Sequence, residues 1–170
     1  MSAQEIFDVR VQTADFDVAH EYQGIIADAG NPGAVVMFSG LVRDVAPGSG
    51  ADGQASAAAG QSLTLEHYPG MTEKALRAIV EQARARWPLQ AVRVVHRVGK
   101  LLPHDQIVLV LTASAHREAA FAAAEFIMDY LKTSAPFWKK QRFGEQSEWV
   151  ASRQSDYQRA ARWENTPADE

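Results

Sequence analysis

The sequence predicts an α+β domain in which a mixed or antiparallel sheet is covered by helices. Short stretches of apolar residues at strand length are separated by amphipathic stretches of helical length. Some of the expected strands follow one another directly, with only a turn between them. That order argues against a doubly wound parallel sheet, in which helices and strands alternate strictly. We expect the helices to cover one face of the sheet.

The length and charge of the chain limit what it can be. Its 170 residues fit one domain, so we expect residues 1–170 to form a single unit. Hydrophobic residues make up 46% and charged residues 22%, which excludes disorder throughout. The net charge of −4 and the pI of about 5.7 argue against partners such as nucleic acid or an anionic membrane. Any anion site must therefore be a local cluster of basic residues.

The chain contains no cysteine, which excludes disulfides, thiolate metal sites and a cysteine nucleophile or persulfide carrier. If the chemistry involves sulfur, another molecule must supply it. We expect no metal site, because His20, His67, His96 and His104 lack a metal-ligand spacing. No signal peptide or membrane-spanning stretch is recognisable, so a soluble, cytoplasmic protein is expected.

The elements expected in the first third of the chain are two strands and a helix. Alternation predicts a strand over 5–11, and apolar residues at helical spacing predict a helix over 16–29, ended by Gly30-Asn31-Pro32-Gly33. An apolar run predicts a strand over 34–42. The segment 44–61 consists almost entirely of Gly, Ala, Ser and small polar residues, so it is expected to be a flexible loop within the domain.

Further strands and helices follow this loop. We expect a strand over 62–68 and an amphipathic helix over 72–87, with Thr72 as its N-cap and Pro88 after its end. Two strands, 91–98 and 106–113, are expected to be joined by a turn at 102–105. A third helix is expected over about 115–133, and residues 164–170 are expected to be a disordered tail.

Three basic stretches are candidates for the anion site, and Arg43 is the first. It lies where a predicted strand meets the flexible loop, and from there its guanidinium can pair with phosphate or carboxylate. Taken alone, Arg43 is as well explained as a solvated charge that ends the strand.

The second candidate is the start of the third predicted helix. With Ser114 as the N-cap, His116 and Arg117 fall in the first turn, where free N–H groups and the helix dipole favour an anion. Basic side chains are unfavourable at this end of a helix, which suggests that an anion binds there. A first turn with a solvated arginine and a packed histidine is the alternative.

The third candidate is the stretch from Lys132 to Lys140. Pro136 should end the helix after Lys132, and the aromatic residues Phe137 and Trp138 can anchor the turn and hold Lys139 in place. A lysine beside aromatic residues and other cations can have its pKa lowered, which suits proton transfer. For any one lysine, a surface position with a cation–π contact is the alternative.

Five segments of the chain form long motifs: GAVVMFSGLVRD (33–44), LTLEHYPGMTEKAL (63–76), VHRVGKL (95–101), TASAHREAAF (112–121) and IMDYLKTSAPFWKK (127–140). In these segments the chain closely resembles the catalytic large subunits of molybdopterin synthase. The resemblance covers about residues 5–163, and the motifs LEHYPGM and LKTSAPFWK are highly specific.

The resemblance implies a fold, partners and a reaction. The family has an α/β-hammerhead-type fold and forms a homodimer that binds a small ubiquitin-like sulfur-carrier subunit at each end, giving a heterotetramer. The carrier's C-terminal Gly-Gly, as a thiocarboxylate, enters the large subunit and delivers sulfur to cyclic pyranopterin monophosphate. Two sulfur transfers build the dithiolene of molybdopterin. No cofactor is implied, because the sulfur arrives on the partner.

The resemblance also implies roles for individual residues. Lys132 corresponds to the lysine that meets the carrier's terminal carbonyl, and Lys139 to the lysine regarded as essential for transfer. Arg153 corresponds to an arginine that reaches the site from the other protomer. The implied substrate-binding residues are Arg43, His116 and Arg117, with Leu41, Val42, Lys140 and Gln141 beside them. Gln141 departs from the family, which commonly has an acidic residue there, and the 44–61 loop is an unusually long insertion.

Two functions remain open from the residues themselves. The first is a catalytic sulfurtransferase subunit, which needs Lys132 and Lys139 to handle protons. The alternative is a non-catalytic module that binds a carrier-protein tail or a phosphorylated metabolite. A nucleic-acid binder is disfavoured by the acidic composition and by the lack of an evident basic stripe with interleaved aromatic residues. The enzyme needs the basic stretches to converge in one hollow.

Overall fold

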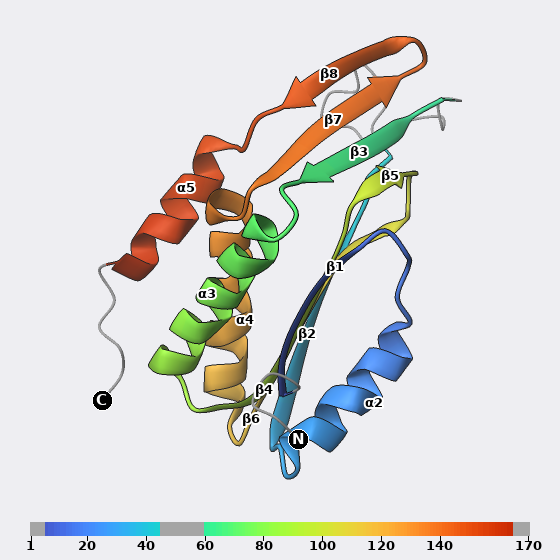
Figure 1. Ribbon diagram of the computed structural model, residues 1–170. Helices are drawn as coiled ribbons and strands as arrows, with labels where there is room; N and C mark the ends of the chain where they lie inside the picture. The colour runs from blue at the N-terminus through green and yellow to red at the C-terminus, as the bar shows by residue number, and fades with distance from the viewer. Residues whose placement is uncertain (1–5, 45–59, 165–170) are drawn as a thin grey trace.

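The computed structural model describes residues 6–44 and 60–164, which form two four-stranded sheets and their helices (Figure 1). Most of the expected flexible loop at 44–61 and of the expected tail at 164–170 lies outside these described residues. The mixed α and β content agrees with the expected α+β class.

The first sheet has the strand order β1-β4-β6-β2. β1 pairs in parallel with β4, and the other two pairings are antiparallel. Its strands are β1 (Phe7–Gln12), β2 (Ala34–Leu41), β4 (Leu89–Arg97) and β6 (Gln106–Ser114). All four were expected from their apolar patterns, with bounds that differ by a few residues.

Helices cover both faces of the first sheet, so the expectation of helices on one face was wrong (Figure 1). α2 (Val18–Ala29) buries Ile25 against the face formed by Val95 and Leu109. α3 (Met71–Arg86) and α4 (Arg117–Ser134) pack on the opposite face, which includes Val94 and Val110. Both faces of β4 and β6 are apolar for this reason, and continuous apolar runs do not reveal how many faces are covered.

The second sheet has the strand order β5-β3-β7-β8 and is antiparallel throughout. Its strands are β3 (Ser62–His67), β5 (Gly99–Leu101), β7 (Phe137–Phe143) and β8 (Gln146–Val150). Only β3 was expected. The short β5, the charged β7 and the exposed β8 lack the apolar pattern by which the other strands were recognised.

An apolar contact attaches the second sheet to one end of the first. Val42, at the end of β2, forms a buried cluster with Leu63, Leu65 and Leu101 of the second sheet, and Ile107 of β6 packs against it. Burial of this kind contributes about 25 cal/mol for each Å² of apolar surface removed from water. The face of the second sheet that carries Leu63 and Leu65 is therefore turned toward the first sheet.

Thr72 provides a polar connection at the same junction. Its hydroxyl accepts a hydrogen bond from the backbone N–H of Tyr68 (3.0 Å) and donates one to the carbonyl of Pro136 (3.0 Å). The side chain is fully buried. The expected N-cap role of Thr72 was wrong, because α3 begins one residue earlier, after Gly70. Gly70 has a φ of 83°, which favours glycine, and its N–H donates to the Glu73 carboxylate.

The C-terminal helix α5 (Gln154–Ala161) and the 3-10 turn η1 (Arg162–Glu164) pack back onto α4. The buried Asp129 of α4 accepts hydrogen bonds from the indole N–H of Trp163 (2.8 Å) and the guanidinium of Arg162 (3.0 Å). Trp163 also makes edge contacts with the rings of Trp87 and Phe126. These contacts hold the end of α5 and the turn that follows it against α4.

Within the described ranges, no helix is long and apolar enough to cross a membrane.

Replacing Thr72 with valine tests the junction. Thr72→Val keeps the shape of the side chain but leaves the Tyr68 N–H and the Pro136 carbonyl without their partner. We expect a loss of about 1 to 3 kcal/mol in the free energy of unfolding, measured by chemical denaturation. Thr133→Val is the matched control, because the Thr133 hydroxyl bonds within its own helix and to the adjacent Ser134. Equal losses of unfolding free energy in both variants would show that the Thr72 hydrogen bonds at the junction stabilise the fold no more than those of Thr133.

Candidate functional site

Lys139 lies in the middle of the second sheet. It is part of β7, where it pairs with Leu65 of β3 on one side and Val150 of β8 on the other. Directly paired residues project to the same face, so Lys139 projects toward the same side as Leu65. That is the face turned toward the first sheet. A strand with neighbours on both sides fixes the backbone from which this lysine extends.

Lys132 lies at the end of α4, just before the chain turns into β7. The helix runs two residues beyond Lys132 to Ser134, so the expectation that it ends after Lys132 was wrong. Pro136 still acts as expected, because Ala135 is extended and the helix does not continue past it. The carbonyl of Lys132 accepts a hydrogen bond from the hydroxyl of Ser152 (3.3 Å), which ties the segment after β8 to the end of α4.

The start of α5 adds Arg153 and Asp156 to this region. Asp156 accepts a hydrogen bond from the backbone N–H of Arg153 (3.2 Å), which fixes the first turn of the helix. Both side chains act electrostatically on Lys139, as does Lys132. The resemblance implies that Arg153 reaches the site from another protomer, but in the structure Arg153 lies close to Lys139 of its own chain.

The pKa of Lys139 is lowered from its ordinary value of 10.5. The largest cause is desolvation by the surrounding protein, even though Lys139 is an exposed residue by its solvent-accessible surface. The positive charge of Lys132 also lowers the pKa, as does Arg153 to a smaller degree, while Asp156 raises it. Lys139 therefore loses its proton more readily than a free lysine, which suits a group that must take up and release a proton.

His96 lies near this lysine, a position that no sequence pattern predicted. The ring of His96, at the end of β4, stacks on the ring of Phe137 at a centroid distance of 3.9 Å. Its Nδ1 lies 2.8 Å from the carbonyl of Arg97. Burial, together with the charges of Lys139 and His67, lowers the pKa of His96 to about 4. His96 is therefore neutral at pH 7 and supports the start of β7 by stacking.

Lys140 and Gln141 fall on opposite faces of β7. Gln141 pairs with Leu63 and so shares the face of Lys139. Lys140 projects to the other face, where its amino group lies 5.4 Å from the ring of Trp149. The expected grouping of Lys140 with Lys139 is therefore not met, because successive residues of a strand point to opposite sides.

The end of β2 places Arg43 beside the junction of the two sheets. Val42 is buried in the cluster that joins the sheets, whereas Leu41 and Arg43 are exposed. The backbone of Val42 is held by hydrogen bonds with Asp105 and His104. Of the residues expected beside the substrate, Leu41 and Arg43 thus remain accessible at the same end of the first sheet as Lys139.

His116 and Arg117 lie at the opposite end of the molecule. They stand at the start of α4, and at 1.5 Å per residue the helix separates Arg117 from Lys132 by about 22 Å. Both side chains are exposed. His116 is the N-cap, not Ser114 as expected, because the Ser114 hydroxyl donates to the carbonyl of Pro88 (2.9 Å) instead. The expected convergence of all the basic stretches is therefore not achieved within one chain.

What one chain does bring together is a lysine of lowered pKa, two further cations and a carboxylate. Such an arrangement stabilises negative charge that develops on a bound molecule and can move a proton at Lys139. Across the parts of the chain that the structure describes, no group of three or more His, Asp or Glu side chains could hold a metal ion.

Comparisons with known proteins all lead to one family. The family described as "MoaE protein" matches residues 11–134. The molybdopterin synthase catalytic subunit of Vibrio cholerae is 57% identical over 92% of this chain and 97% of its own. A molybdopterin cofactor biosynthesis protein E from Burkholderia multivorans has a similar solved structure, with a TM-score of 0.76, 48% identity and coverage of 94% of this chain and 97% of its own. The structure of molybdopterin synthase from Staphylococcus aureus matches with a TM-score of 0.71 and 29% identity, over 83% and 95% of the two chains.

Variants of the neighbouring charges test the environment of Lys139. Removing a positive charge in Lys132→Gln is expected to raise the pKa of Lys139, and removing a negative charge in Asp156→Asn is expected to lower it further. The asparagine keeps the acceptor for the Arg153 N–H. NMR titration of the lysine side-chain signals measures both shifts, with the exposed Lys74→Gln as the control. Shifts in the same direction for both variants would contradict the placement of these charges.

The buried His96 predicts a loss of stability in mild acid. As the pH falls from about 6.5 to about 4, the unfolded chain binds a proton at His96 that the folded chain does not bind. The contribution is fully present above pH 6.5 and falls by about 3 kcal/mol by pH 4, at about 1.4 kcal/mol per pH unit. The free energy of unfolding, measured by denaturation across this pH range, should decline less steeply in His96→Gln than in the unmodified chain. An identical decline in both proteins would mean that His96 does not remain neutral when folded.

Proposed function

The chain belongs to the MoaE protein family, and on this premise we propose that it is the catalytic subunit of molybdopterin synthase. In this role it takes part in the biosynthesis of the molybdenum cofactor, in the cytoplasm. It converts cyclic pyranopterin monophosphate to molybdopterin by transferring sulfur. The observation that carries the proposal is the cluster of Lys132, Lys139 and Arg153, in which Lys139 has a lowered pKa.

A second protein must supply the sulfur, because the chain has no cysteine. We propose a small ubiquitin-like carrier whose C-terminal Gly-Gly thiocarboxylate enters the space beside Lys139. At each transfer, sulfur forms a bond to a substrate carbon as a carbon–oxygen bond of that carbon breaks, the oxygen leaving on the opened phosphate or as water. Water then cleaves the acyl carbon–sulfur bond, so the carrier leaves as a carboxylate. The chain needs no cofactor of its own for this sequence.

The basic residues act on charge and protons in this reaction. Negative charge develops on the carrier's carbonyl oxygen and on the cyclic phosphate as it opens, and the ammonium of Lys132 and the guanidinium of Arg153 stabilise it. Lys139, with its lowered pKa, can accept a proton at one step and return it at another. Their fixed positions in the last turn of α4, within β7 and at the start of α5 mean that little reorganisation is needed.

A second copy of the chain would complete the site. β2 is an edge strand of the first sheet, and its residues Met37, Phe38 and Leu41 are exposed. If β2 pairs antiparallel with the β2 of another copy, Leu41 of one chain approaches Ala34 of the other. Ala34 pairs with Ser114, just before His116 and Arg117. A symmetric dimer would thus place His116 and Arg117 of one copy near Arg43 of the other, although these residues lie far apart within one chain.

Loss of the two lysines tests the proposed chemistry. The chain is mixed with a thiocarboxylated carrier and cyclic pyranopterin monophosphate, which should give the dithiolene product. The amount of product is measured over time in a single turnover. We expect Lys139→Ala to slow product formation by about 100-fold or more, the usual scale of a lost proton-transfer group. Lys132→Ala should also slow product formation. Carrier binding without any product from the unmodified chain would instead identify a non-catalytic binding module.

Mixed dimers test the proposed sharing of the site. Lys139→Ala and Arg117→Ala are each expected to be inactive as pure proteins. When the two are unfolded together and refolded in equal amounts, half of the dimers should be mixed, and each mixed dimer should hold one intact site of two. About a quarter of the normal activity should therefore return. No return of activity, with mixed dimers shown by mass spectrometry, would place Arg117 outside the site that contains Lys139.

A further inference from the structure

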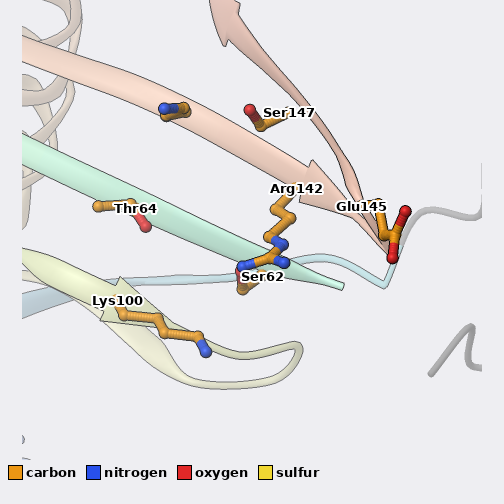
Figure 2. A pocket seen from close by; sticks show the side chains of 7 residues that line it. Ser62, Thr64, Lys100, Arg142, Glu145 and Ser147 are labelled. Atoms are coloured by element: carbon orange, nitrogen blue, oxygen red, sulfur yellow. The ribbon is translucent and has the colours of Figure 1, made fainter. Parts of the chain in front are cut away.

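The outer face of the second sheet carries a separate group of cations. It lies on the side opposite Lys139 and surrounds a cavity of about 230 Å³. Seven residues line it: Ser62, Thr64, Lys100, Lys140, Arg142, Glu145 and Ser147. Figure 2 shows Arg142 reaching from β7 toward Ser62 on β3, with Lys100 extending from β5 on the same side.

The strand register explains why these side chains meet. Thr64 pairs with both Lys100 and Lys140, so the two lysines flank it on neighbouring strands about 4.8 Å away on either side. In the next row, Arg142 lies between Ser62 and Ser147. Three cations and three hydroxyl groups are thus held on one face by the backbone of a four-stranded sheet.

Among the described residues, none of the cations of this face lies within ion-pair distance of a carboxylate. In the described part of the chain, Lys100, Lys140 and Arg142 form no ion pair, although Glu145 also lines the cavity. The Nε of Arg142 donates to the carbonyl of Gly144 (2.7 Å), which holds the guanidinium in place. Other cations of this acidic chain do form ion pairs, as Arg93 does with Glu21 and Asp28.

We propose that this cavity is a second anion site, one that binds a phosphate or diphosphate group. A fixed arginine and two lysines supply charge, and the three hydroxyl groups supply directed hydrogen bonds. The cavity is smaller than the roughly 300–1,000 Å³ that drug-sized ligands occupy, so it fits the anionic group and not a whole nucleotide. The site does not depend on the proposed function, because the sheet separates it from Lys139.

The phosphate-type group can be a free anion or the end of a larger metabolite. Inorganic phosphate and pyrophosphate represent the first source and ADP the second, and each is titrated into the isotope-labelled chain while backbone amide signals are followed by NMR. We expect pyrophosphate to shift the signals of Ser62, Thr64 and Ser147. If ADP binds as tightly, the site accepts a phosphoryl group on a larger molecule, and if it does not, the site is one for the free anion.

Charge variants separate this site from the site at Lys139. Lys100→Gln and Arg142→Gln are each expected to weaken pyrophosphate binding by about tenfold or more, since each removes one of three cations. Lys74→Gln removes the same charge from an exposed position on α3 and should leave binding unchanged. Lys139→Ala should also leave it unchanged, because Lys139 projects to the other face.

Three results would overturn the proposal. The first is equal pyrophosphate binding by Lys100→Gln, Arg142→Gln and the unmodified chain. The second is a set of signal shifts that Lys139→Ala abolishes, which would place the anion at the other site. The third is binding of a short single-stranded oligonucleotide at this face without binding of pyrophosphate. In that case the exposed Trp138 and Trp149 would serve as stacking surfaces for bases.

Discussion

The attachment of the second sheet to the end of the first determines where the chemistry can occur. The contact consists of a small apolar cluster around Val42 and Leu65, reinforced by the buried hydroxyl of Thr72. It orients β7 so that Lys139 projects toward the first sheet. Because the end of α4 leads directly into β7, the same contact also fixes Lys132. The two lysines keep their spacing only while this junction holds.

Placing the positive charges of Lys132, Lys139 and Arg153 close together has an energetic cost, because they repel one another. Lys139 responds to desolvation and to Lys132 with a lowered pKa, while Asp156 offsets part of the repulsion. The neutral, stacked His96 adds bulk beside the cluster without adding charge. An anion that enters this space would relieve the repulsion, so the cost in the free chain becomes favourable binding energy for that anion.

Local patterns sufficed for the first sheet and its helices, because their apolar residues recur at strand or helix spacing. They failed for β7 and β8, which carry charged and exposed residues; β7 is a strand because it pairs with β3, and β8 because it pairs with β7. The importance of Lys139 was predicted from its neighbours Phe137 and Trp138 and from the family motif. Its proximity to Arg153 and His96 depends on long-range packing and could not be derived from spacing. The distance between Lys132 and Arg117, in contrast, follows from helix length alone once both residues are placed at the two ends of α4.

The pH dependence of single-turnover sulfur transfer tests the role of Lys139 most directly. If Lys139 moves the proton, the rate should titrate with a midpoint equal to the Lys139 pKa measured by NMR in the same protein. In a Lys132→Gln variant that retains measurable transfer, both values should move upward together. A rate profile whose midpoint stays in place while the pKa of Lys139 shifts would show that another group carries the proton.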